Sequence, residues 1–159
     1  MTGLPLRYSI ESDFTFYQND ARRNRGLLYV VMIDLDNFKL INDRHGHPVG
    51  DMVLRHLADT LKSSLRGNEP LYRFGGEEFL WLLPCNAVGE AEQSARRLME
   101  AVNKAPFRLP DGKLLKLTLT LGLAQAGDHE ELASAIKRSD RAMYKGKKAG
   151  RDRYVLTRI

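Results

Sequence analysis

Two short acidic clusters carry the side chains of this sequence that are best suited to chemistry. Asp34 and Asp36 end an apolar run, and Glu77 and Glu78 follow two adjacent glycines. Asp34 comes directly after a segment expected to be buried, where an unpaired carboxylate is strongly unfavourable. If both clusters reach one edge of a sheet, a shared divalent cation would neutralise them. Carboxylates without cysteine ligands favour Mg²⁺, Mn²⁺ or Ca²⁺ over zinc.

Simpler interpretations exist for the same residues. A Gly-Gly-Glu-Glu sequence is usually a solvated turn, and Asp36 is equally well interpreted as a solvated acid or a helix N-cap. His45 and His47 are candidate metal ligands, but a His-Gly-His sequence in a loop is more typical of a turn.

Basic and amide side chains near the acidic clusters could recognise a nucleotide. Lys39, Lys147 and Arg151 are candidates for phosphate contacts, although surface lysines usually face solvent. Asn42 and Asp51 are candidates for base recognition, because a carboxylate accepts from the N1–H and N2–H₂ edge of guanine and adenine offers no such pair of donors. The alternatives are hydrogen bonding at a helix end for Asn42 and the N-cap of a helix for Asp51.

The composition indicates one globular domain with an anionic ligand. The 159 residues are 43% hydrophobic and 28% charged, with a net charge of +5. The basic residues are spread along the chain, so we expect no nucleic-acid partner. No apolar run approaches the roughly 20 residues that span a bilayer, and no signal pattern opens the chain. Cys85 is the one cysteine, and together these features favour a reducing cytoplasm.

The elements that must position these residues follow from periodicity. We expect helices at residues 7–25, 37–44, 51–65, 90–104 and 130–145, and strands at 27–33, on either side of Gly75-Gly76, and at 115–123 and 153–156. The run at 27–33 is typical of a central strand covered on both faces. Leucines alternating from 115 to 123 predict a half-buried antiparallel strand. The glycine pair predicts a tight hairpin turn, because glycine reaches positive φ without steric strain. The expected fold class is α+β, with a mixed, mainly antiparallel central sheet covered by helices.

Several spaced motifs together resemble the GGDEF family of diguanylate cyclases in its GGEEF form. The matching segments are residues 34–43, 46–47, 50–51 and 73–79, with an opening motif at 2–5 and a closing signature at 140–144, 147 and 150–153. The resemblance covers essentially all of residues 1–159 as one domain. It implies a fold like the palm of nucleotidyl cyclases and polymerases, and we expect the chain to be the C-terminal part of a longer protein whose sensory domain precedes it.

The resemblance implies a metal site and a catalytic residue. The carboxylate of Asp34, the backbone carbonyl of Leu35 and the carboxylate of Glu77 would hold Mg²⁺ or Mn²⁺. Glu78 would engage the metals and help to activate the attacking hydroxyl, so that Glu77 and Glu78 are the expected catalytic pair.

The resemblance also implies which residues hold GTP. Phe38 and Lys39 would line the nucleotide pocket, and Asn42 and Asp51 would read guanine. Gly75 and Gly76 would leave room for the phosphates. Lys147 and Arg151 would contact the triphosphate.

The function that the resemblance implies is condensation of two GTP into cyclic di-GMP with release of two pyrophosphates. Because one domain holds one GTP, a homodimer is expected to be required for catalysis. The alternative is a non-catalytic GGDEF-like receptor for GTP or cyclic di-GMP; the intact set of Asp34, Glu77 and Glu78 favours the enzyme. A third possibility, a structural interaction domain, leaves the convergent carboxylates unexplained.

A product-binding regulatory site is also expected by resemblance. Relatives carry an Arg-x-x-Asp motif shortly before the hairpin, and here residues 66–69 place Arg66 and Glu69 at its ends. Arg97 stands where a second domain would contribute an arginine. The simpler interpretations are an Arg66 contact with carbonyls at its helix end and a solvated Arg97.

Overall fold

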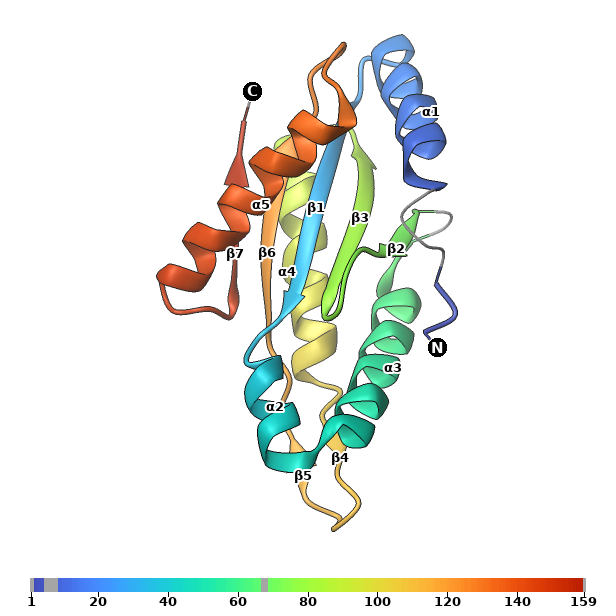
Figure 1. Ribbon diagram of the computed structural model, residues 1–159. Helices are drawn as coiled ribbons and strands as arrows, with labels where there is room; N and C mark the ends of the chain where they lie inside the picture. Colours follow the sequence, from blue (N-terminus) through green and yellow to red (C-terminus); the bar gives the residue numbers. More distant parts are fainter. Residues whose placement is uncertain (1, 5–8, 67–68, 159) are drawn as a thin grey trace.

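The apolar run from residue 27 forms β1 (Leu27–Leu35), the central strand of a five-stranded sheet. The computed structural model describes residues 2–4, 9–66 and 69–158. Figure 1 shows the strand order β2-β3-β1-β6-β7, with β2 at Leu71–Arg73, β3 at Glu78–Cys85, β6 at Leu119–Gln125 and β7 at Arg153–Thr157. β6 and β7 pair in parallel, whereas the other neighbours are antiparallel. The expected mixed, mainly antiparallel sheet is confirmed.

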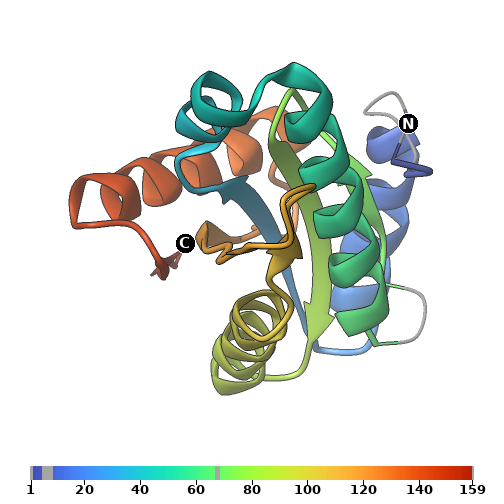
Figure 2. The same ribbon diagram turned by 90° about the horizontal axis from the view of Figure 1, so that it is seen from below.

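Helices cover both faces of this sheet. They are α1 (Ile10–Arg23), α2 (Phe38–His45), α3 (His47–Ser64), α4 (Val88–Asn103) and α5 (Leu132–Lys148). Successive strand residues point to opposite faces, so Val31 and Ile33 pack with α3 and α4, whereas Val30 and Met32 pack with α1 and α5. Figure 2 shows α4 and α5 on opposite sides of the sheet. β1 is therefore buried on both faces, as its continuous apolar sequence predicts.

The segment predicted as one strand at 115–123 is divided in the structure. A small second sheet pairs β4 (Phe107–Arg108) with β5 (Leu114–Leu115), and β6 begins only at Leu119. The prediction that this strand is half-buried is also wrong. Thr120, Gly122 and Ala124 on its second face are buried as well, because α5 packs directly over β6.

The helix boundaries differ from the expected ones by up to four residues. α3 begins at His47, since Gly46 separates it from α2 with a φ of +87°. Asp51 is therefore inside α3 and exposed, and its interpretation as an N-cap is wrong. The expected start of the first helix at residue 7, Pro5 of the opening motif and residues 67–68 lie outside the described residues. None of the described helices has both the length and the apolar character needed to cross a membrane.

Candidate active site

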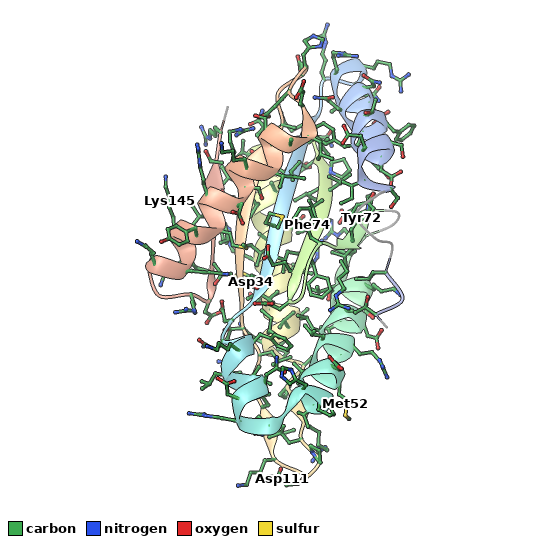
Figure 3. The ribbon with its side chains drawn as sticks, viewed as in Figure 1. Asp34, Met52, Tyr72, Phe74, Asp111 and Lys145 are labelled. Carbon is green, nitrogen blue, oxygen red and sulfur yellow. The ribbon has the colours of Figure 1, made fainter. Side chains whose placement is uncertain are left out.

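The two acidic clusters meet at the end of β1. β1 continues through Asp34 instead of ending before it, and Asp34 is the register partner of Glu78 on β3. The backbone N–H of Leu35 donates to the carbonyl of Glu77 at 3.4 Å. Figure 3 shows Asp34 near the end of β1, between α2 and α5. The sheet register thus brings together the carboxylates that the sequence separates by more than 40 residues.

Asp34 is a buried carboxylate with one satisfied oxygen. Its side chain is 5% exposed, and Oδ2 forms an ion pair with Nζ of Lys147 on α5. Oδ1 is buried and has no hydrogen-bond partner among the described residues. Burial raises the pKa of Asp34 above its ordinary value, although the hydrogen bond and charge of Lys147 lower it. A second cation at Oδ1 would stabilise the ionised form.

Glu78 lies in a similarly unfavourable environment for its charge. Burial raises the pKa of Glu78, and the carboxylates of Asp34 and Asp140 raise it further. Within the described part of the chain, however, no three or more His, Cys, Asp or Glu side chains form a ready-made metal cluster. Asp34 is nevertheless the register partner of Glu78 and lines one pocket with Glu77, and Lys147 is its counter-charge.

The hairpin turn before Glu78 is held by backbone and arginine contacts. The amides of Phe74 and Gly75 donate to the carbonyl of Glu78 at 2.9 and 3.3 Å. The Arg73 guanidinium donates to the carbonyls of Gly75 and Gly76 at 3.4 and 2.9 Å. The hairpin is confirmed, but its predicted cause is wrong, because neither glycine has a φ in the left-handed region. A Cβ at either glycine would meet nothing within 4 Å, so the turn presents open backbone.

A pocket of about 450 Å³ opens beside Asp34. It joins the acidic edge to α2 and to the end of α5, and it is lined by Asp34, Leu35, Asp36, Asn37, Phe38, Lys39, Leu40, Asp43, Glu77, Lys147 and Arg151. The three expected phosphate-binding cations are thus in one cavity with Asp34 and Glu77. Such a mixture of carboxylates and cations suits a metal-bound polyphosphate.

The expected guanine-binding residues lie beside this pocket, not in its lining. A Cβ added to Gly50 would lie 1.8 Å from Oδ1 of Asn42 and 3.3 Å from the Phe38 ring, so α2 and α3 are closely packed here. Oδ1 of Asn42 is buried without a hydrogen-bond partner among the described residues. Asp51 follows Gly50 and is exposed. The Asn42 acceptor therefore lies close to Phe38, and the Asp51 carboxylate is exposed one residue after Gly50.

Glu78 lines a different pocket, of about 420 Å³, on the α5 side. Its lining is Glu78, Asp140, Arg141, Met143, Tyr144, Lys145 and Lys147. Lys147 belongs to both linings, so it lies between the two cavities.

Asp36 has a role that neither of its predicted interpretations describes. It is buried, and its carboxylate accepts hydrogen bonds from Thr118, Thr120 and the backbone N–H of Asp152. Asn37, with a φ of +59°, occupies the N-cap position of α2. Asp36 is therefore neither solvated nor a helix cap. Its partners are distant in sequence, and no local signal identifies them.

The expected regulatory residues lie near one another, beside β3. The half-buried carboxylate of Glu69 accepts a hydrogen bond from Nε1 of Trp81 at 3.0 Å. Burial raises the pKa of Glu69, whereas the Trp81 hydrogen bond and the charges of Arg97 and Arg66 lower it. The arginines are thus close enough to act electrostatically on Glu69. Residues 67–68 of this motif lie outside the described part of the chain.

Comparisons with known proteins match nearly the whole chain to one protein family. The family model described as "Diguanylate cyclase, GGDEF domain" matches residues 1–153. Diguanylate cyclase DgcZ of Escherichia coli is 39% identical over 156 residues, which cover 98% of this chain and 52% of DgcZ. The chain spans about half or less of the curated relatives that it matches.

Two solved domains have the same fold over nearly the whole chain. The GGDEF domain of TpbB from Pseudomonas aeruginosa has a TM-score of 0.92 and 35% identity, and the alignment covers 100% of this chain and 99% of that one. The active GGEEF domain of a diguanylate cyclase from Vibrio cholerae has a TM-score of 0.85 and 34% identity, with coverage of 98% and 99%. The α+β fold is therefore that of the solved GGDEF domains.

Proposed function

This chain belongs to the GGDEF family of diguanylate cyclases, and we propose that its 159 residues form one catalytic domain that condenses two GTP into cyclic di-GMP and releases two pyrophosphates. The observation that carries this proposal is the acidic edge. Asp34 has a buried, unpartnered oxygen, lies in register with Glu78 and shares a pocket with Glu77 and with Lys147. A module that only binds nucleotide has no chemical need for this set of carboxylates.

Diguanylate cyclases of this family use a divalent metal, and the residues present here fit one. We propose Mg²⁺, with Mn²⁺ as a substitute, held by the Asp34 carboxylate, the Leu35 carbonyl and Glu77, with Glu78 also engaged. The unpartnered Oδ1 of Asp34 supports this assignment, and so do the pKa values of Asp34 and Glu78, which burial raises and a bound cation would lower. When bound, the metal supplies charge neutralisation and acidifies the attacking hydroxyl.

Lys147 is proposed to change partner when GTP binds. Without nucleotide it neutralises Asp34. The triphosphate carries more negative charge than one carboxylate, so Lys147 turns to the phosphates together with Lys39 and Arg151. Gly75 and Gly76 admit the phosphates because no side chain blocks the turn. Asp34 is then free to accept the cation.

Glu78 is the proposed general base. The 3′-hydroxyl of one GTP attacks the α-phosphate of the other, its proton passes to the Glu78 carboxylate, and pyrophosphate leaves. A carboxylate with a raised pKa accepts a proton more readily than an ordinary one, which suits this role. Two domains must face each other to supply both GTP molecules, so a homodimer is part of the proposal.

Guanine selection is assigned to α2 and α3. The unpartnered Oδ1 of Asn42 is an acceptor, and Asp51 supplies a carboxylate for the paired N1–H and N2–H₂ donors of guanine. Phe38, between the pocket and Gly50, provides an apolar surface for the base.

A product site is proposed at Arg66, Glu69 and Arg97. The two arginines would pair with guanine or phosphate groups of cyclic di-GMP, and Glu69 would accept from the base. Because Trp81 already donates to Glu69, this carboxylate must share its acceptor capacity. Product inhibition is therefore expected to be present but weaker than in a relative with the Arg-x-x-Asp motif.

The rival receptor function is tested by separating binding from turnover. GTP affinity, measured by calorimetry with Mg²⁺, and product formation are compared for the unchanged protein, Glu78→Gln and Glu77→Ala. We expect Glu78→Gln to bind GTP but make no product, and we expect Glu77→Ala to make none. Asp59→Asn, an exposed carboxylate on α3 outside both pockets, is the control. An unchanged protein that binds GTP or cyclic di-GMP without turnover would establish the receptor instead.

A further inference from the structure

The carboxylate of Asp36 connects the end of β1 to the loop between α5 and β7. Oδ2 accepts from Oγ1 of Thr118 at 2.7 Å and from the backbone N–H of Asp152 at 3.0 Å, and Oδ1 accepts from Oγ1 of Thr120 at 2.6 Å. The residue is 6% exposed. A buried carboxylate with three donors on it is well satisfied and holds its neighbours in one arrangement.

The loop that Asp36 contacts has an unfavourable backbone. Gly150 has a φ of +122°, and the next two residues, Arg151 and Asp152, have φ values of +62° and +49°. Residues with a Cβ rarely adopt this left-handed region, and they keep it only where surrounding contacts hold them there. Two consecutive residues of this kind point to a loop whose shape is imposed from outside.

The contacts on this loop show where that constraint comes from. The Arg151 N–H donates to the carbonyl of Gly146 at 3.0 Å, and Nε of Arg153 donates to the Arg151 carbonyl at 2.9 Å. Both contacts stay among the end of α5, the loop and the first residue of β7. The hydrogen bond from Asp152 to Asp36 reaches instead to the residue that directly follows β1, the strand that carries Asp34.

We propose that Asp36 is a positioning residue that holds the Arg151 loop at the pocket, so that this arginine meets the phosphates of the nucleotide. The inference rests on the proposed GTP site. Arg151 is exposed and lines the same cavity as Lys147 and Asp34. The position of its guanidinium therefore depends on how firmly the loop backbone is held. Loss of the Asp36 acceptor would free the loop, and none of the three hydrogen bonds that this carboxylate accepts comes from α2 or α3.

The consequence is a selective loss of triphosphate recognition. Guanine recognition is assigned to Asn42 and Asp51, which are on other elements. A merely structural role for Asp36 would weaken binding of every nucleotide alike. The ratio of GTP affinity to GMP affinity separates these two possibilities, since only GTP carries the β- and γ-phosphates.

The test is a double-mutant cycle on the whole chain. GTP and GMP affinities are measured by calorimetry with Mg²⁺ for the unchanged protein, Asp36→Ala, Arg151→Ala and the double variant. We expect Asp36→Ala to lower the GTP-to-GMP affinity ratio about tenfold, as expected for one charge-assisted hydrogen bond. Arg151→Ala should do the same. The affinity ratio of the double variant should fall no further than that of Arg151→Ala, because both single changes remove the same contact between Arg151 and the phosphates.

Two further variants keep the proposal testable if Asp36→Ala folds poorly. Asp36→Asn retains one acceptor oxygen for the Asp152 N–H and should lower the GTP-to-GMP affinity ratio less than Asp36→Ala does. Thr120→Val removes a buried hydrogen bond to the other oxygen and should leave the ratio unchanged. The positioning role would be overturned by an Asp36 variant that leaves the GTP-to-GMP affinity ratio unchanged, whether or not both affinities fall. It would also be overturned if the loss of this ratio in the double variant exceeded the loss in Arg151→Ala. An unchanged protein without preference for GTP over GMP would overturn the proposed function itself.

Discussion

At the scale of single residues, the Asp34–Lys147 ion pair is the contact whose partners are expected to change most on binding. Lys147 is paired with the Asp34 carboxylate, which the metal would need as a ligand. The same lysine lines both cavities. A positive charge at this point opposes a cation in the nucleotide-free protein and attracts the triphosphate once GTP arrives.

Replacing Lys147 by methionine should therefore separate the two effects. We expect Mn²⁺ affinity of the nucleotide-free protein to rise by about tenfold, because the competing charge is removed, and GTP affinity to fall. Electron paramagnetic resonance of free Mn²⁺ measures the first and calorimetry the second. Lys148→Met is the matched control, since Lys148 lies over the Tyr144 ring and not on Asp34. Unchanged Mn²⁺ and GTP affinities in Lys147→Met would contradict the exchange of partners.

The regulatory residues give a second prediction at this scale. Shortening Glu69 to aspartate restores the Arg-x-x-Asp motif, removes a methylene whose rotamers must be fixed on binding and draws the carboxylate away from Trp81. Inhibition by cyclic di-GMP should become several-fold tighter, and Arg66→Ala should remove it. Initial rates at increasing product concentration measure both effects. Inhibition constants that respond to neither change would show that this stretch does not bind product.

At the scale of elements, the packing of α5 against β6 sets the position of Lys147. The hydroxyl of Ser139 donates to the Gly122 carbonyl at 2.7 Å and accepts from the Met32 amide at 2.9 Å. A Cβ at Gly122 would lie 2.0 Å from the carbonyl oxygen of Ser139 and 2.5 Å from the Met143 nitrogen. The close approach of α5 to β6 thus depends on glycine at position 122. This contact holds α5 at Ser139, about two helical turns before Lys147.

A methyl group at Gly122 should displace α5. Gly122→Ala is expected to lower the free energy of unfolding by about 1–3 kcal/mol or more and to weaken GTP binding, because Lys147 moves with the helix. Urea denaturation and calorimetry check the two effects. Gly89→Ala is the control: it lies in α4 with nothing within 4 Å of an added Cβ, and alanine there should be neutral or stabilising by up to about 1 kcal/mol. Equal stability of both variants would contradict the close packing.

The elements also show which features could be predicted from sequence. The apolar run of β1 and the acidic ends of β1 and β3 are local signals, and both were found where expected. The burial of β6 on its second face was not predicted, because Thr120 and Gly122 look like solvent-facing positions until α5 covers them. Asp36 was misinterpreted for a similar reason: its three donors lie 82, 84 and 116 residues away. Tertiary contacts decide such roles, and local patterns do not encode them.

At the scale of the whole molecule, Glu130 connects α1, β6 and α5 at one end of the sheet. Its carboxylate accepts from the Gly127 amide and from Arg138, and Arg138 also donates to the Gln125 carbonyl. Gln18 of α1 donates to the carbonyls of Gly127 and Glu130. The hydrogen bond from Arg138 is the main cause that lowers the pKa of Glu130 from 4.5 to about 2.

This lowered pKa predicts a pH dependence of stability. A group with a lower pKa in the folded state contributes its full stability above the unfolded pKa of 4.5, and the contribution is lost as the pH falls through about 2. Glu130→Gln should be less stable at neutral pH by about 1–3 kcal/mol, with a shallower decline between pH 4.5 and 2. Denaturation at several pH values measures this, with the exposed neighbour Glu131→Gln as control. Parallel curves for Glu130→Gln and the unchanged protein would refute it.

The nucleotide products formed from GTP show whether the acidic edge supports synthesis of cyclic di-GMP. Purified protein is incubated with GTP and Mg²⁺, and nucleotides and pyrophosphate are quantified by chromatography and an enzymatic assay. We expect one cyclic di-GMP for every two pyrophosphates, at a rate that rises more steeply than protein concentration because two domains must meet. GTP that is bound yet recovered unchanged, or equal product from Glu77→Ala, would contradict it.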